Sequence, residues 1–289
     1  MSPLLPQITY QGPILDLHQH SLYSGRTHQQ LLTHQSHHGI ETTVLLPGEG
    51  WMMERLGGNS DCTQLQAEHR DKFLRFACAD AAESRAVDVL LGHLERGAIG
   101  IGEMKFHVAV DSPEMQRVYK LAQEHGVPIL IHFQYETYNT GLKRFESVLK
   151  AYPRVNFIGH AQTWWGHVSM DLNPLVMYPK GSVKVGGLTD RLLSNYPNIY
   201  GDLSAGSGLN AITRDPDFGA GFLQRHSRRL IWGSDCDCHD GQGAGTRRGT
   251  CLAEQSLSAL KKLVSDEGAL RHIVYENGAD LLGLNRKRI

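Results

Sequence analysis

The sequence predicts a parallel (β/α)8 barrel, the TIM barrel fold, built as a single domain. Eight short apolar runs recur along the 289 residues, and successive runs start 28, 31, 25, 29, 28, 44 and 31 residues apart. This spacing fits one strand and its crossover helix in each repeat. Near-continuous apolar strands are typical of a parallel sheet that is covered on both faces. The runs begin at Ile14, Thr42, Phe73, Ala98, Val127, Val155, Ile199 and Leu230.

Amphipathic segments between the apolar runs predict the helices. Residues 113–126 predict a helix that starts at Pro113, with Asp111 and Ser112 as candidate capping residues, and ends at Gly126. Residues 255–283 predict two terminal helices, because apolar positions recur on one face. Eight strands, seven crossovers and a closing helical segment fit a closed barrel.

Two segments are longer than a connection in this fold requires, namely residues 49–70 after the second strand and 161–197 after the sixth. In a barrel, the loops that follow the strands lie on the catalytic face. We therefore expect both long loops to shape a substrate pocket. No linker or low-complexity segment divides the chain, so we predict one domain over residues 1–289.

The composition argues against several kinds of partner. Lys plus Arg is 29 and Asp plus Glu is 30, and no basic stripe indicates binding to nucleic acid. No apolar run approaches the roughly 20 residues of a membrane span. Five scattered cysteines fit a reducing compartment, and the N-terminus lacks the features of a signal peptide. We expect a cytoplasmic protein with a small-molecule substrate, and the sequence leaves a homo-oligomer open.

The strongest functional signal is an Asp-x-His-x-His motif at the end of the first strand. Alternation along a strand places Asp16, His18 and His20 on one face, where the two imidazoles can share a metal ion. Only a closed barrel brings the ends of strands one, five, six and eight to one mouth, so the fold and a metal site support each other. The candidates at the ends of the later strands are His132, His160 and Asp235.

This ordered set resembles the amidohydrolase superfamily, and it is most similar to the branch of amidohydrolases, lactonases and related decarboxylases called amidohydrolase 2. The likeness extends from Leu15 to Leu284. The ending HIVYENGADLLGL also resembles the closing helix of that branch, in which an Asn precedes small residues and leucines. The set is specific for the superfamily and says little about the substrate.

The resemblance implies a divalent metal, most often zinc, present as one ion or two. The implied ligands are His18, His20, His132 and Asp235, and Asp235 would also accept a proton from the attacking water. His160 would bind a second ion or hydrogen-bond the water or the substrate. A Lewis-acidic ion lowers the pKa of bound water from 15.7 to about 7, which makes hydroxide available near neutral pH.

The fourth strand carries three further candidates, Glu103, Lys105 and His107, which alternation places on one face. Glu103 in its Gly-Glu context resembles the metal ligand of TatD-like deoxyribonucleases. We favour Glu103 as a ligand over the alternative, a Glu103–Lys105 charge pair inside the barrel. Lys105 could instead be a carboxylated bridge between two metals or hold a substrate carboxylate, and His107 would contact the substrate.

Other residues are weaker candidates. Trp164 and Trp165 directly follow His160 and could stack on a flat substrate, although packing of the long loop explains them equally well. Cys236 and Cys238 are one residue apart, without the usual spacing of a zinc motif, so we expect them to line the pocket. The histidines of the first crossover helix are expected to be solvated or capping: His28, His34, His37 and His38.

These observations predict a hydrolase that cleaves a C–O or C–N bond in a lactone, ester or amide of a small metabolite. The alternative is metal-dependent, non-hydrolytic decarboxylation of an aromatic or unsaturated acid. A third hypothesis, a metal-binding protein without catalysis, requires that the residues at the barrel mouth have lost their function. The fourth strand separates the first two, because a bridging Glu103 indicates two metals and hydrolysis, whereas one metal leaves decarboxylation open.

Overall fold

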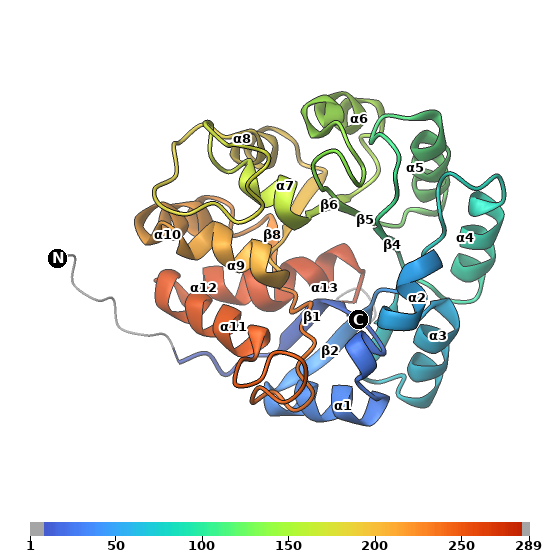
Figure 1. The fold of residues 1–289 in the computed structure, drawn as a ribbon, viewed down its shortest axis with the longest axis horizontal. Helices are drawn as coiled ribbons and strands as arrows, with labels where there is room; N and C mark the ends of the chain where they lie inside the picture. The colour runs from blue at the N-terminus through green and yellow to red at the C-terminus, as the bar shows by residue number, and fades with distance from the viewer. Residues whose placement is uncertain (1–8, 285–289) are drawn as a thin grey trace.

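Eight parallel strands follow one another in chain order, surrounded by helices, within residues 9–284, which the computed structural model describes (Figure 1). Each observed strand lies within or overlaps one of the predicted apolar runs, so the predicted barrel is confirmed. The strands are β1 (Ile14–Gln19), β2 (Ile40–Leu45), β3 (Phe73–Arg75), β4 (Ile101–Met104), β5 (Ile129–His132), β6 (Phe157–His160), β7 (Ile199–Asp202) and β8 (Leu230–Ile231).

Hydrogen bonds just beyond the regular strands close the ring. The regular pairing gives one sheet of β1–β3 and another of β4–β8. Ala77 pairs with Ile101 and joins β3 to β4. On the other side, the Leu17 amide donates to the Trp232 carbonyl at 3.2 Å, and the Asp235 amide donates to the His18 carbonyl at 2.8 Å. The second pair of bonds places the end of β8 beside the end of β1.

The helices form the outer layer, and some of them lie within the two long segments (Figure 1). The helix α5 follows its prediction closely: Ser112 caps it through the Met115 amide, and Gly126 ends it in the left-handed conformation. A one-turn π-helix, His272–Glu276, joins the last two helices. The α-helices are α1 (His28–His37), α2 (Met53–Leu56), α3 (Asn59–Glu68), α4 (Ala86–Glu95), α5 (Pro113–His125), α6 (Phe145–Ala151), α7 (Ala161–Gly166), α8 (Leu188–Asn195), α9 (Ala205–Thr213), α10 (Pro216–Arg225), α11 (Leu252–Leu263), α12 (Glu267–Arg271) and α13 (Asn277–Leu281).

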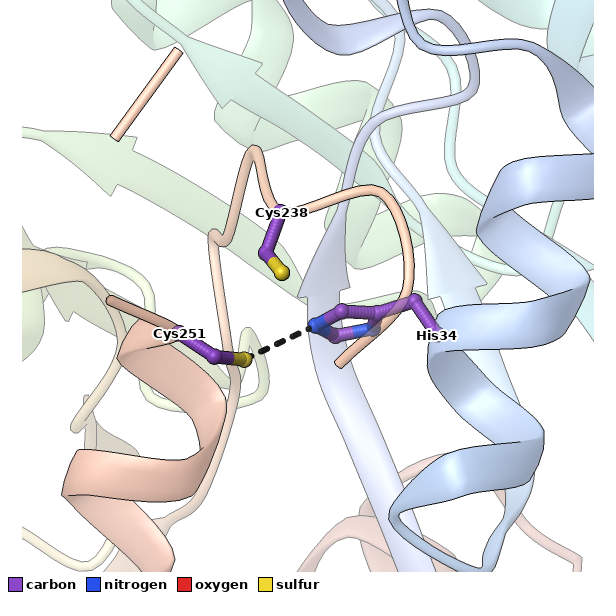
Figure 2. Close-up of side chains that lie close together, drawn as sticks. All are labelled: His34, Cys238 and Cys251. Carbon is purple, nitrogen blue, oxygen red and sulfur yellow. Dashed lines mark hydrogen bonds between the residues drawn. The ribbon is translucent and has the colours of Figure 1, made fainter. Parts of the chain in front are cut away.

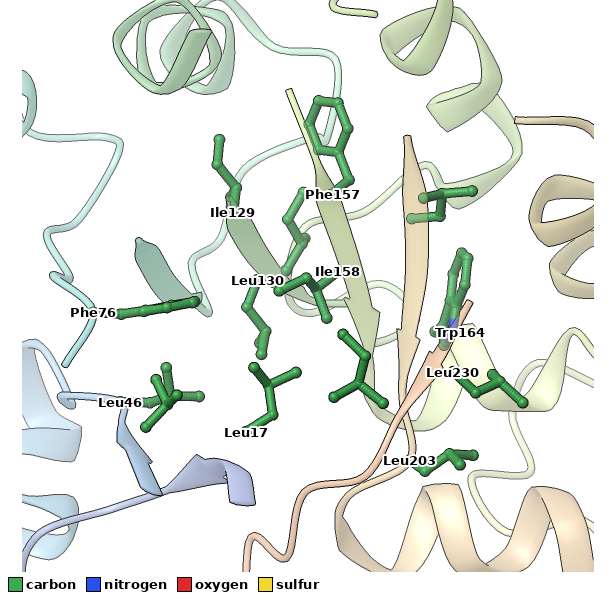
Figure 3. Close-up of a cluster of buried hydrophobic side chains, with 14 of the residues drawn as sticks. Leu17, Leu46, Phe76, Ile129, Leu130, Phe157, Ile158, Trp164, Leu203 and Leu230 are labelled. Carbon is green, nitrogen blue, oxygen red and sulfur yellow. The ribbon is translucent and has the colours of Figure 1, made fainter. Parts of the chain in front are cut away.

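Apolar side chains from the strands pack with those of the surrounding helices into one large core (Figure 3). Leu17, Leu130 and Ile158 have no exposed surface. This core holds the strand ends in place and so leaves the residues at the barrel mouth to carry out chemistry. None of the helices in the described part of the chain is long and apolar enough to cross a membrane.

The two long segments, predicted as loops, contain helices. Residues 49–70 form a 3-10 turn (Gly50–Met52), α2 and α3, and residues 161–197 include α7 and α8. Both segments still contribute to the mouth, because Arg55 from the first and Gln162 from the second line the cavity described below.

Asn277, the Asn of the closing helix, ties α13 to β8. Its side-chain amide donates to the carbonyl oxygens of Ser227 at 2.7 Å and Leu230 at 2.8 Å. We expect Asn277→Ala to lower the free energy of unfolding by roughly 1–3 kcal/mol, because one buried and one partly buried carbonyl lose their donor. Asn195→Ala, at the exposed end of α8, is the control and should change it by less than about 0.5 kcal/mol. Equal denaturant midpoints for the two variants would contradict the role of Asn277.

Candidate metal centre

Six predicted side chains meet at the carboxyl end of the barrel. Two ligand groups have donor atoms within 4.8 Å of one another: His18, His20 and Asp235 form one, and His18, Glu103 and His160 form the other. The remaining predicted ligand, His132, contacts Glu103 through its Nδ1 atom. The strand ends therefore bring together every residue predicted to bind metal, from positions up to 217 residues apart.

The carboxylate of Glu103 lies between two pairs of imidazoles. Its Oε2 atom is 3.8 Å from the Nε2 atom of His18 and 3.8 Å from that of His20. Its Oε1 atom is 3.6 Å from the Nε2 atom of His160 and contacts Nδ1 of His132. Each oxygen thus faces a different pair of nitrogen donors, as a bridging ligand requires.

Asp202, at the end of β7, orients two of these imidazoles. Its Oδ2 atom accepts hydrogen bonds from Nδ1 of His18 at 2.7 Å and Nδ1 of His160 at 3.0 Å. Because each Nδ1 carries the proton, the Nε2 lone pairs are directed at the centre. His20 is oriented in the same way, since its Nδ1 donates to the Leu46 carbonyl at 2.7 Å. The sequence interpretation missed Asp202, although it is a polar residue at a strand end like the others.

Asp235 reaches the centre from a strained backbone. Its φ angle is 43°, in the left-handed region that few residues other than glycine adopt. The hydrogen bond from its amide to His18 holds this conformation. The Oδ1 atom of Asp235 then lies 3.4 Å from Nε2 of His20. Strain of this kind is frequent at functional sites.

The buried carboxylates of the site favour the binding of a cation. Burial alone lowers the pKa of His18, but Asp235 and Asp202 outweigh it and raise the pKa to about 10. Burial alone raises the pKa of Asp235, but His18 and His20 outweigh it and lower the pKa to about 2. A proton on His18 therefore offsets only part of the charge of three buried carboxylates, those of Glu103, Asp202 and Asp235, when no metal is present.

The donor set fits a divalent metal. His18 Nε2 and Asp235 Oδ1 are buried and lack a hydrogen-bond partner in the described part of the chain. Buried polar atoms without a partner are costly, so such atoms usually mark a ligand. Imidazole nitrogens and carboxylate oxygens together are suitable ligands for zinc and similar ions.

A cavity of about 340 Å³ opens directly onto these groups. Three cations, Arg55, Lys105 and Arg247, line it together with Tyr23 and Tyr178. A larger cavity of about 560 Å³ lies beside Gln134 and His167, but it contains none of the predicted ligands. The smaller cavity is therefore the candidate substrate site.

Only one of the four predicted substrate contacts, Lys105, lies in this cavity. The prediction for His107 is wrong: β4 ends at Met104, the alternation stops there, and His107 is exposed against the ring of Tyr138. Glu103 and Lys105 do not form the alternative ion pair either. The Nζ atom of Lys105 lies 5.6 Å from the centre of the Tyr138 ring instead.

The predictions for Trp164 and Trp165 are wrong as well. Both side chains are almost fully buried and face the barrel wall. Trp164 packs against Phe133, and the indole nitrogen of Trp165 donates to the Asp202 carbonyl at 2.8 Å. They form part of the core because α7 begins immediately after β6 and turns these rings inward.

Two further sequence interpretations fail near β1 and β8. Asp16 does not join the site, and the pairing of β1 with β2 is irregular between Asp16 and Gln19. Its carboxylate accepts hydrogen bonds from Ser234 instead. Cys236 and Cys238 are buried and are not among the residues that line the cavity.

Comparisons with known proteins support the fold. No protein-family model and no curated protein sequence matches the chain. Among solved structures, a probable 2-pyrone-4,6-dicarboxylic acid hydrolase from Acinetobacter baumannii is similar, with a TM-score of 0.62, 15% identity and coverage of 93% of this chain and 99% of that chain. An amidohydrolase II has a TM-score of 0.58, 15% identity and coverage of 93% and 99%.

A third similar structure is 2,6-dihydroxybenzoate decarboxylase from Rhizobium, with a TM-score of 0.55, 15% identity and coverage of 95% of this chain and 100% of that chain. These likenesses extend over nearly the whole chain. The predicted resemblance is therefore confirmed for the fold: the chain shares its (β/α)8 barrel with these solved structures.

Asp202→Asn tests the orientation of the imidazoles. The amide places an NH2 group or a weaker acceptor opposite His18 and His160, so we expect the affinity for zinc to fall about 10- to 100-fold while the fold persists. Competition with a chromogenic chelator measures this affinity. Asp111→Asn, which affects only a surface pair with Arg144, is the control. Equal zinc affinities for the two variants would refute the role of Asp202.

Proposed function

We propose that this protein is a metal-dependent hydrolase that cleaves a C–O or C–N bond of a small metabolite. The observation that carries this proposal is the position of Glu103, whose two carboxylate oxygens face different pairs of imidazoles. This arrangement suits two divalent ions, with zinc the best match to the donors. One ion would be held by His18, His20 and Asp235, the other by His132 and His160, with Glu103 between them.

The ions would supply a water of lowered pKa and polarise the bond under attack. The chain itself supplies the proton transfers. Asp235 is ionised at neutral pH, so its carboxylate can accept the proton of the attacking water and return it to the leaving group. Asp202 keeps the proton of His18 and His160 on Nδ1 throughout. Tyr23 and Tyr178 line the same cavity.

The cavity favours an anionic substrate. Arg55, Lys105 and Arg247 line a volume of about 340 Å³ that otherwise carries the carboxylates of the metal centre. These three cations form a cationic wall in the same cavity as the metal centre, and this wall can hold a substrate carboxylate while a lactone, ester or amide bond lies at the ions. The likeness to a probable 2-pyrone-4,6-dicarboxylic acid hydrolase supports this substrate class.

Decarboxylation of an aromatic acid is the second candidate. The presence of Lys105 in the cavity favours it, because the ammonium group can hold the carboxylate that leaves as carbon dioxide. The similar decarboxylase from Rhizobium shows that this barrel can carry that reaction. For either reaction we propose a reducing, cytoplasmic setting, since all five cysteines are free.

Glu103→Gln distinguishes two metals from one. An amide cannot offer an anionic oxygen to each of two cations, so metal content should fall from about two ions per chain towards one or none. Elemental analysis of purified protein gives the content, with the exposed Glu124→Gln as the control. Unchanged metal content together with a lower melting temperature would overturn the bridging role. That result would favour the single-metal decarboxylase.

Asp235→Asn separates proton transfer from metal binding. The amide keeps an oxygen ligand but cannot accept the proton, so kcat should fall about 100- to 10,000-fold, much further than metal occupancy. A screen of lactones, amides and aromatic acids identifies the substrate for this measurement. Asp217→Asn, on the surface of α10, should retain full activity. Near-normal turnover in the Asp235 variant would exclude this carboxylate as the base.

A further inference from the structure

A second cluster of metal-binding side chains lies behind the candidate centre, between α1 and the loop that joins β8 to α11 (Figure 2). The loop contributes Cys236 and Cys238, and Cys251 stands at the first turn of α11. His34 comes from the inward face of α1. Each of these four residues is at most 5% exposed. No sequence pattern connects these residues, because 217 residues separate His34 from Cys251.

The donor atoms of three of these residues lie close enough together to share one ion, and Cys236 lies against one of the three. Those of His34, Cys238 and Cys251 all lie within 4.8 Å of one another. The Nε2 atom of His34 is 3.5 Å from the sulfur of Cys251, and the sulfur of Cys236 is 3.8 Å from it. With bond lengths of about 2.3 Å to sulfur and 2.05 Å to nitrogen, tetrahedral zinc separates two sulfurs by about 3.8 Å and a sulfur from a nitrogen by about 3.6 Å.

His34 is held in the form that binds a metal. The side-chain NH2 group of Gln35 donates to Asp16 and Thr43, so its oxygen is the acceptor for Nδ1 of His34 at 2.7 Å. The proton of His34 is therefore on Nδ1, and the Nε2 lone pair faces the sulfurs. A ligand imidazole is commonly fixed through its other nitrogen in this way.

Neighbouring thiols and burial raise the pKa of Cys236 and Cys238, and three features of the surroundings act in the opposite direction. The amide of Gly243 donates to the sulfur of Cys238 at 3.1 Å, and Cys251 lies at the N-terminus of the twelve-residue helix α11. The buried guanidinium of Arg26 donates to the carbonyls of Cys236 and Cys238 at 2.7 and 3.1 Å. Three thiolates, one imidazole and one divalent ion carry a net charge of −1, which this cation can offset.

We propose that His34, Cys238, Cys251 and Cys236 bind a zinc ion at a site separate from the barrel mouth. Cys236 completes the set because its thiol lies against both other cysteines. His38, whose Nε2 atom is 3.3 Å from the sulfur of Cys251, donates a hydrogen bond to that thiolate. Binding releases the thiol protons to solvent, and no oxidation is involved.

With four protein ligands and deep burial, this site is structural. It fastens the loop between β8 and α11 to α1. That loop carries Asp235 immediately before Cys236 and Arg247 at the wall of the cavity. The zinc ion therefore holds the loop from which the candidate metal centre and the substrate cavity are both partly built.

Cobalt(II) is the probe for this site, because thiolate-to-cobalt charge transfer gives an absorption that the sulfur-free centre at the barrel mouth cannot produce. Reduced protein loaded with cobalt should show this band, and zinc should displace it. The Cys238→Ser/Cys251→Ser double variant should lack the band. Cys62→Ser, at another buried cysteine far from the cluster, should keep it.

His18→Ala/His132→Ala should also keep the band, since it removes ligands of the other centre only. This variant separates failure of the second site from failure of the proposed enzyme site. Absence of the band in the reduced, cobalt-loaded wild-type protein would overturn the proposal, without reliance on any variant that folds poorly. A Cys236–Cys251 disulfide in the isolated protein, found by mass spectrometry together with no cobalt binding after reduction, would likewise overturn it and assign the pair a redox role.

Discussion

The closure of the barrel between β8 and β1 is the constraint on which the candidate site depends. The amide of Asp235 donates to the His18 carbonyl, and this bond brings the last strand end beside the first. Without closure, Asp235 would stand at the far edge of an open sheet from His18 and His20. Because β8 has only two regular residues, the bonds beyond it carry much of the closure. Asn277 supports the same strand from α13.

Closure of the barrel also brings several carboxylates together at a buried position. Each of the carboxylates of Glu103, Asp202 and Asp235 lies within 4.0 Å of at least two of the four imidazoles. Buried anions are tolerated only when cations or hydrogen bonds compensate them. A proton on His18 provides part of this compensation, and divalent ions would provide it more fully. The strained φ angle of Asp235 is then maintained by the surrounding packing rather than by local preference.

Much of the fold and the ligand set could be predicted because both depend on short-range patterns. An apolar run followed by a polar residue marks the end of a buried strand, which locates His132, His160 and Asp235, and the same rule would have located Asp202. The rule fails where a strand is shorter than its apolar run. The strand β4 stops at Met104, so alternation could not place His107.

Residues whose positions depend on tertiary packing could not be predicted in this way. The rings of Trp164 and Trp165 face the core because of how α7 packs, which no local periodicity specifies. The cluster of His34 and Cys251 arises from contact between the first and eleventh helices of the chain. A search for closely spaced cysteines finds Cys236 and Cys238 but neither of their distant partners, so the sequence favoured pocket lining for both.

The loop between β8 and α11 connects the metal centre at the barrel mouth with the proposed second zinc site. Residues at different points of this loop depend on the second site to different degrees. Its glycine-rich part, 241–249, has few apolar side chains with which to order itself. Arg26 donates hydrogen bonds to the carbonyls of Cys236, Cys238 and His20. It therefore joins the second cluster to the end of β1. The hydrogen bond to His18 of β1 anchors Asp235 even if the second zinc site is empty. Arg247 lies further along the loop, in its glycine-rich part. Loss of zinc from the second site should therefore displace Arg247 and the cationic wall of the cavity more than it displaces the metal ligands at the barrel mouth.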